Sequence, residues 1–154
     1  MRTITTLILG LLLGLMATPL LAGDNFRTHC NGGNEVPPVD SDGQCQAIFN
    51  LTEDETGLRY KLIVANLEFV TQAHIHLAPA GQNGGVVAFL FGFEPGGVTV
   101  NGILAQGVLT DGDLIGALSG MTIADLVAEL ETGDAYVNVH TQSMPPGEVR
   151  GQIH

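Results

Sequence analysis

The chain has 154 residues, 45% of them hydrophobic, and its 16 acidic residues outnumber five basic ones to give a formal net charge of −11 at pH 7. This length suits one domain better than two. An acidic surface repels nucleic-acid phosphates and anionic lipid head groups, so the composition disfavours nucleic acid as a partner and makes cations better candidates.

The N-terminus has the pattern of a secretory signal peptide. Arg2 precedes a leucine-rich apolar run, and the segment closes on the small residue Ala22. A membrane anchor is the alternative, but the run is shorter than the roughly 20 residues that a span needs, and Pro19 interrupts it. We therefore predict a signal peptide over residues 1–22 and a secreted or periplasmic domain over residues 23–154, with no stable membrane span after cleavage.

The chain contains two cysteines, Cys30 and Cys45. Export to an oxidising compartment favours a disulfide between them, and their spacing suits two strands joined by a turn-rich loop. Within that loop, residues 34–38 read as an irregular edge segment because proline cannot donate a ladder hydrogen bond. A CxxC pair is absent, so the sequence does not indicate thiol redox chemistry.

Strand patterns recur through the middle of the chain. Residues 45–51 and 58–64 alternate apolar and polar side chains around a polar turn, which predicts a hairpin. Residues 86–93 form a continuous apolar run, which is typical of a central strand in a sandwich. Residues 98–109 predict one or two short strands, and residues 148–154 predict the last one.

One segment has helical periodicity. Thr122 and Asp125 resemble a capping box, and Gly133 stands where a left-handed C-cap is expected. Between them, apolar residues recur at i, i+3, i+4 and i+7: Ile123, Leu126, Val127 and Leu130. With the many short strands and Gly/Pro turns, the sequence predicts an all-β fold: an antiparallel β-sandwich, Greek-key-like, with one short α-helix near residues 122–131.

Three histidines fall on the polar faces of two predicted strands. Side chains alternate along a strand, so His74 and His76 point to one side of the first, and His140 lies on the polar face of the second. If the strands are neighbours, the imidazoles meet and could hold copper or zinc with one coordination position open. The alternatives are a hydrophilic sheet surface with ordinary solvated histidines, or histidines that are hydrogen-bonded to hold loops.

Polar neighbours could support such a site. Gln72, Asn138 and Glu148 could hydrogen-bond the histidine ligands. Arg150 has two interpretations: an ion pair with Glu148 or a loop acid, or capture of an anionic group beside the histidines. No nucleophile elbow or phosphate-binding glycine loop is present in the sequence, so catalytic residues of those kinds are not predicted.

Four phrases of the sequence occur together in the order typical of one family. They are NEVPP at residues 34–38, AHIHLAPAG at 73–81, YVNVHT at 136–141 and PGEVRGQI at 146–153. Over about residues 30–154 the chain resembles the chordin-type (CHRD) domain family. The resemblance implies a secreted or extracellular all-β module, which in animals repeats within a secreted antagonist of growth-factor signalling and in bacteria occurs as a single domain. The cysteine pair lies outside the family pattern.

These observations lead to three functional hypotheses. The first is a secreted binding or interaction module with a transition-metal site on the histidine face, whose partner is an extracellular or envelope protein or a metal ion. The second is a copper- or zinc-dependent redox metalloenzyme of superoxide-dismutase-like type. The third is an envelope or matrix structural protein without a metal.

Overall fold

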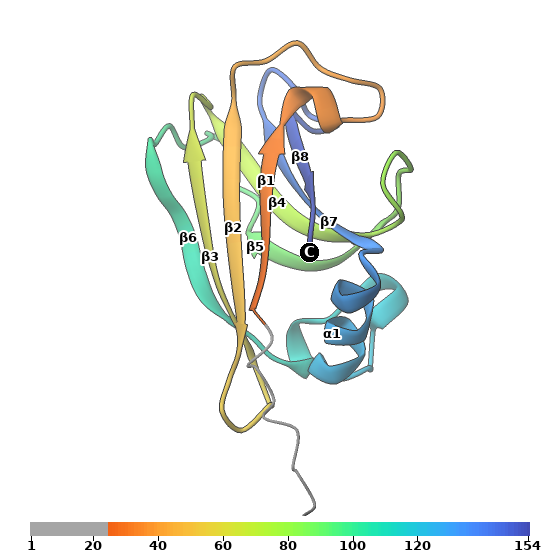
Figure 1. The fold of residues 1–154 in the computed structure, drawn as a ribbon. Coiled ribbons are helices and arrows are strands. Elements are labelled where there is room, and N and C mark those ends of the chain that lie inside the picture. The colour runs from red at the N-terminus through yellow and green to blue at the C-terminus, as the bar shows by residue number, and fades with distance from the viewer. Residues whose placement is uncertain (1–24) are drawn as a thin grey trace, which may run out of the picture.

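The computed structural model describes residues 25–154, so the predicted signal peptide lies outside the described residues. The described chain forms eight strands and one α-helix (Figure 1). The elements are β1 (Asn25–Asn31), β2 (Gln44–Leu51), β3 (Leu58–Ala65), β4 (Val70–Leu77), β5 (Gly85–Phe91), β6 (Gly102–Leu109), α1 (Ile123–Thr132), β7 (Ala135–Thr141) and β8 (Val149–Gln152). Three single-turn 3₁₀ helices complete them: η1 (Gly32–Asn34), η2 (Asp111–Asp113) and η3 (Gly116–Leu118).

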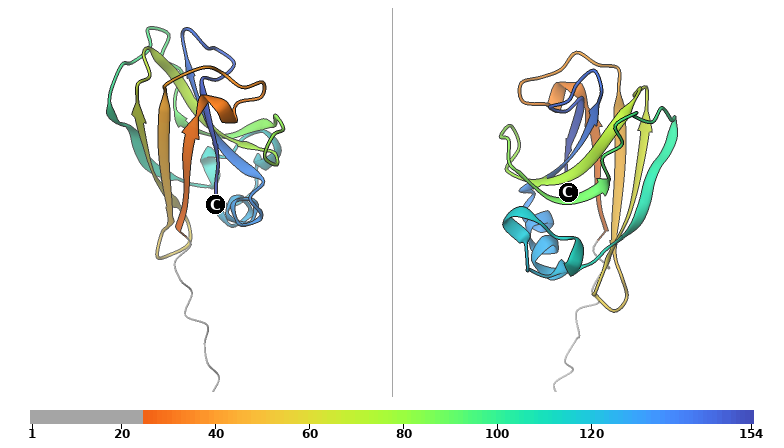
Figure 2. Two further views of the ribbon diagram at one scale, coloured as in Figure 1. Left: turned by 45° about the horizontal axis from the view of Figure 1, so that its top comes forward. Right: turned by 180° about the vertical axis from the view of Figure 1, so that it is seen from behind.

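All eight strands belong to one antiparallel sheet with the order β5-β4-β7-β8-β1-β2-β3-β6. The sheet folds over so that β5, β4 and β7 lie behind the layer of β1, β2, β3 and β6 (Figures 1 and 2). The predicted all-β fold is confirmed, and the two layers are halves of one curled sheet. At its open side, the Tyr60 hydroxyl of β3 donates a hydrogen bond to the Leu90 carbonyl of β5 at 2.8 Å.

The hydrophobic core fills the space between the two halves. Its largest fully buried side chains include Phe49, Leu58, Leu62 and Ile75, which come from both layers. Where β8 meets β1, the backbones approach so closely that a Cβ on Gly151 would lie 2.5 Å from the His29 carbonyl oxygen. Glycine at this position therefore allows the last strand to join the two halves.

The predicted helix is confirmed as α1. The Asp125 carboxylate accepts hydrogen bonds from the backbone N–H and the hydroxyl of Thr122, at 2.8 and 2.7 Å. Gly133 ends the helix in the left-handed conformation, with φ of 77°. The four apolar side chains predicted to share a face are all buried. The helix covers one end of the folded sheet, below β7 in Figure 1.

The prediction that residues 86–93 form a central strand is wrong. β5 stands at the end of the strand order and pairs with β4 alone. Its outer side chain Phe89 remains 44% exposed. The following segment forms a single strand, β6, preceded by an isolated bridge between Val98 and Val70.

The predicted disulfide between Cys30 and Cys45 is confirmed. The two residues are direct partners in the β1–β2 ladder, with their Cα atoms 4.6 Å apart. Both side chains are buried at the edge of the core. The bridge therefore joins two strands that already pair.

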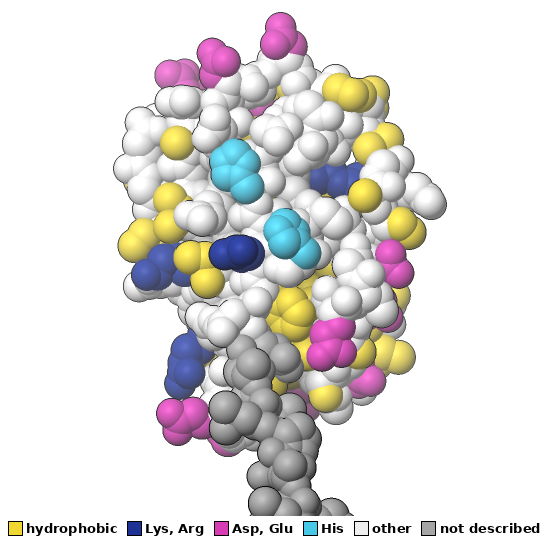
Figure 3. Space-filling view, viewed as in Figure 1, with side chains coloured by type: hydrophobic (Ala, Val, Ile, Leu, Met, Phe, Trp, Pro, Cys, Tyr) yellow, Lys and Arg dark blue, Asp and Glu magenta, His cyan; other side chains and the backbone are white. Residues whose placement is uncertain are grey.

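The outer face of β1, β2 and β3 carries histidine and basic side chains, and acidic side chains lie around its rim (Figure 3). The exposed basic residues of these strands are Arg27, Arg59 and Lys61. Within residues 25–154, no helix has the length and hydropathy of a membrane span.

Candidate metal centre

The histidines are placed by the pairing of β4 with β7. In this antiparallel ladder His74 is opposite Asn138, His76 is opposite Tyr136, and Gln72 is opposite His140. Partners across a ladder point to the same side of the sheet. The pairing therefore brings all three imidazoles to one face, as strand alternation predicted.

The three imidazoles form a compact and buried cluster. His74, His76 and His140 are only 4%, 9% and 6% exposed, and they offer ring nitrogens that lie within 4.8 Å of one another. The alternative of three solvated histidines is wrong, because loops and the Phe89 ring cover this face. The Phe89 ring contacts His74 edge-on, with 4.6 Å between ring centroids.

Hydrogen bonds to backbone carbonyls fix the protonated nitrogen of two rings. His76 Nδ1 lies 3.0 Å from the Gly84 carbonyl oxygen, and His140 Nδ1 lies 2.8 Å from that of Pro145. A carbonyl can only accept, so each Nδ1 carries the proton and each Nε2 keeps a lone pair. His140 Nε2 then accepts from His74 Nδ1 at 3.1 Å, which leaves a lone pair on His74 Nε2.

Buried acceptors without partners gather at this cluster. Among residues 25–154, the buried side-chain atoms without a hydrogen-bond partner are His74 Nε2, His76 Nε2, Asn138 Oδ1 and, elsewhere, Thr28 Oγ1. Buried polar atoms are normally paired, because each unpaired one costs about 1–3 kcal/mol. Since the three atoms at the site are all acceptors in this tautomer set, a cation or a hydrogen-bond donor is the kind of group that would satisfy them.

The electrostatics of the cluster keep the imidazoles neutral. Burial lowers the pKa of His74 to about 3, and the neighbouring His140 and His76 contribute to the shift. Burial also lowers the pKa values of His76 and His140, although the hydrogen bonds to Gly84 and Pro145 oppose it. Neutral imidazole is the form that binds zinc and copper.

A stack of three side chains holds His76 in place. The rings of His76 and Tyr136 are parallel within 8° at 4.8 Å, and the Arg150 guanidinium lies 3.4 Å from the Tyr136 ring centroid. Arg150 also donates to the Gln82 carbonyl at 2.6 Å and to Asn83 Oδ1 at 3.2 Å. The β4–β5 loop that supplies the Gly84 carbonyl is thereby fastened to β8.

The sequence predicts an ion pair of Arg150 with Glu148 or with a loop acid, and the pairing with Glu148 is wrong. Arg150 is 2% exposed and bonds the β4–β5 loop, whereas Glu148 accepts hydrogen bonds from Ser41 at 2.7 Å and Thr141 at 2.5 Å. Glu148 and Arg150 are two residues apart, so strand alternation would place them on one side, but Glu148 lies just before β8, where alternation does not apply. Gln72, also expected near the ligands, is half-buried opposite His140.

Glu35 is a buried residue of the site that sequence reasoning missed. It follows η1, is 7% exposed, and accepts a short hydrogen bond from Asn138 Nδ2. Burial raises its pKa to about 7, although the positive charge of Arg150 opposes the shift. The only signal in the sequence was the phrase NEVPP, which strand and helix periodicity leave unassigned.

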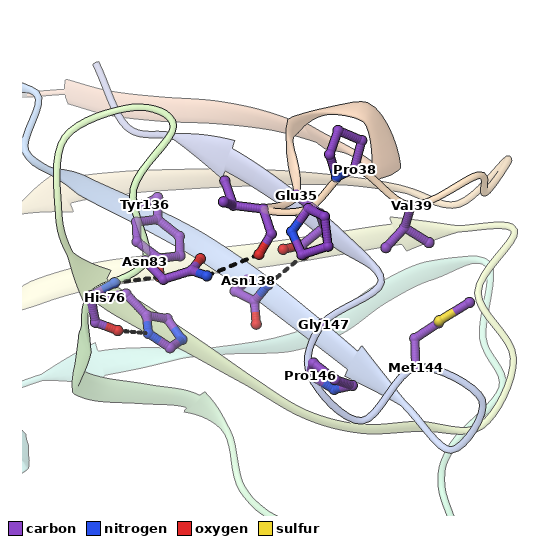
Figure 4. A pocket seen from close by; sticks show the side chains of 13 residues that line it. Glu35, Pro38, Val39, His76, Asn83, Tyr136, Asn138, Met144, Pro146 and Gly147 are labelled. Carbon is purple, nitrogen blue, oxygen red and sulfur yellow. Dashed lines mark hydrogen bonds between the residues drawn. The ribbon is translucent and has the colours of Figure 1, made fainter.

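Three loops enclose a cavity of about 400 Å³ beside the cluster (Figure 4). They are the η1–β2, β4–β5 and β7–β8 loops, and His76 is the only one of the three histidines in the wall. Asn138 lies between Glu35 and His76, with its amide nitrogen towards Glu35 and its oxygen on the opposite side (Figure 4). The wall is otherwise mainly apolar, formed by Val36, Pro37, Pro38, Val39, Met144 and Pro146.

The fold and site together define a small antiparallel β-domain with a buried histidine cluster beneath three loops. A model of the CHRD domain family matches residues 26–153, and the chain belongs to this family. Searches of curated proteins and of solved structures returned no match. Membership supports a binding or interaction module, and the disulfide is compatible with an oxidising compartment.

Proposed function

We propose that this CHRD domain is a secreted or periplasmic binding module that holds a copper or zinc ion on His74, His76 and His140. Two observations carry the proposal: the Nε2 atoms of His74 and His76 are buried without a partner, and the three rings offer nitrogens within 4.8 Å of one another. His140 Nε2 would bind the ion in place of the hydrogen bond that it accepts from His74 Nδ1. Imidazole nitrogens suit both metals, and a carbonyl hydrogen bond on the far nitrogen is the usual way to orient a histidine ligand. The bound ion stabilises the loops around it and so shapes the surface offered to an extracellular or envelope partner.

Metal analysis tests this function directly. Protein purified without a histidine tag should bind one equivalent of Cu²⁺ or Zn²⁺ by titration calorimetry. His76→Ala should lower the affinity by more than about 100-fold, because even the loss of a residue that supports a ligand costs about 10- to 100-fold. His29→Ala is the matched control, since His29 is exposed on β1. Wild-type protein that binds neither metal, and shows no thermal shift with either in excess, would refute the proposal.

A redox metalloenzyme of superoxide-dismutase-like type is the second candidate. The observation that favours it is the cavity beside His76, which gives a small neutral molecule such as hydrogen peroxide room next to the histidines. An assay of superoxide and peroxide turnover by copper-loaded protein distinguishes the two functions. Turnover lost in His76→Ala supports an enzyme, and stoichiometric metal without turnover supports the binding module.

A further inference from the structure

The charged side chains in the wall of the cavity beside His76 favour a cation over an anion. Glu35 is the one acidic residue in its wall, and no lysine or arginine lines it. Arg150 lies on the opposite side of the Tyr136 ring and lines a neighbouring hollow, which shares Glu35 with this cavity. A charged species inside the cavity therefore meets a carboxyl group first.

The buried atoms without partners that lie beyond Glu35 also favour a cation, because they are acceptors. Asn138 donates its amide hydrogen to Glu35 and turns its oxygen away from it (Figure 4). That oxygen and His76 Nε2 are both buried acceptors without a partner. Carboxylate, amide oxygen and imidazole nitrogen thus follow one another from the cavity to the histidines. An anion finds no donor among them, and a divalent cation finds ligands of the kinds it binds.

We propose that this cavity is the access path by which a divalent metal ion reaches the histidines, with Glu35 as the residue that captures it. The inference rests on the proposed metal-binding function. Glu35 attracts the ion into the cavity, and Asn138 holds the carboxyl beside the histidines. The ion then passes to His76, the one histidine in the cavity wall. Glu35 acts on the rate of uptake, and the three histidines set the affinity.

Stopped-flow uptake of Co²⁺, followed through its visible absorption, tests the capture step. At pH 8, above the Glu35 pKa of about 7, the carboxyl is ionised. At that pH and low ionic strength, Glu35→Gln should slow second-order uptake by about tenfold, the lower end of the range for electrostatic steering. The final Co²⁺ spectrum and stoichiometry should stay unchanged. Added salt should slow uptake by the wild type much more than by Glu35→Gln.

Asp40→Asn is the matched control, because it removes the same charge from an exposed position of the same loop that is not in the cavity wall. Its uptake rate should equal that of the wild type. Met144→Trp narrows the cavity without changing its charge and should also slow uptake. This variant tests the access path if Glu35→Gln does not fold. Equal rates in wild type and Glu35→Gln, with Co²⁺ bound by both, would overturn the access path alone. Failure of the wild type to bind Co²⁺, Cu²⁺ or Zn²⁺ would overturn the metal site with it.

Discussion

His76 shows how a single residue is prepared for a ligand. Its Nδ1 hydrogen is held by the Gly84 carbonyl, its ring lies flat on Tyr136, and its Nε2 is buried without a partner. Fixing the ring before a ligand arrives removes the entropy cost of ordering it on binding.

The three lowered histidine pKa values predict how stability depends on pH. In metal-free protein, the unfolded chain takes up protons near pH 6.5 but folded His74 does not until about pH 3. The unfolded state then binds more protons, so the free energy of unfolding falls as the pH falls below 6.5. Glu35 has the opposite effect, because burial raises its pKa from 4.5 to about 7. Its contribution to the free energy of unfolding therefore falls as the pH rises from 4.5 to about 7. Three imidazoles outweigh one carboxyl group.

Urea unfolding of metal-free protein should therefore give a lower free energy of unfolding at pH 5 than at pH 7. His74→Gln, which removes one of the three titrating groups, should flatten the profile. A profile that is flat or rises towards acid in the wild type would contradict the burial of the neutral imidazoles.

The histidine cluster could be predicted from the sequence, but the loops and side chains that cover it could not. Alternation in β4 and β7 places the three imidazoles on one side once the strands pair. Glu35 comes from an irregular segment with no periodicity, and its approach to Asn138 depends on the path of a loop. Phe89 made the run of β5 apolar on both faces, so an edge strand that shields His74 was read as a central strand.

At the scale of secondary-structure elements, the loops between strands hold the histidines in place, and the caps set where the helix begins and ends. The β4–β5 and β7–β8 loops each give a carbonyl to one histidine, and side chains of Arg150 and Glu148 fasten loops that strand patterns leave open. The helix was predictable because its start and stop signals are local: the Thr122–Asp125 box and Gly133 act on neighbouring backbone atoms. Contacts between distant loops have no such local signature.

Gly133 gives a test at this scale. Gly133→Ala should lower the free energy of unfolding by about 1 kcal/mol, because a Cβ is disfavoured in the left-handed conformation. An added methyl group at Gly133 would meet no atom within 4 Å, so the effect is conformational rather than steric. Gly92→Ala, where a methyl group also meets nothing and φ is ordinary, should be nearly neutral in chemical denaturation. Equal effects of the two substitutions would argue against the left-handed cap.

At the scale of the whole molecule, a single sheet folds over to form both layers, and the core lies between them. The composition and short strands predicted this class of fold, but the strand order depends on which distant segments pair. β8 lies between β7 and β1, and only the tertiary structure brings the two ends of the domain together. The disulfide adds a covalent link to the layer that begins with β1.

Removal of the disulfide should reduce the stability of the whole domain. Replacing both Cys30 and Cys45 by alanine should cost about 3 kcal/mol, the chain-entropy value for a closed loop of about 15 residues. Urea unfolding at pH 7 measures the loss, and reduction of the wild type with dithiothreitol should give a loss of similar size. A double variant as stable as the oxidised wild type would show that the bridge contributes nothing to folding.

The position of β8 also has a consequence for how the protein is made. Residues 149–152 are the last strand of the described chain to leave the ribosome, yet they join the two layers. Until they emerge, the nascent polypeptide lacks the piece that unites its halves, and pairing between such distant segments is slow to form. The two layers of this domain can therefore join only after residues 149–152 have been synthesised, however much of the sheet has already paired.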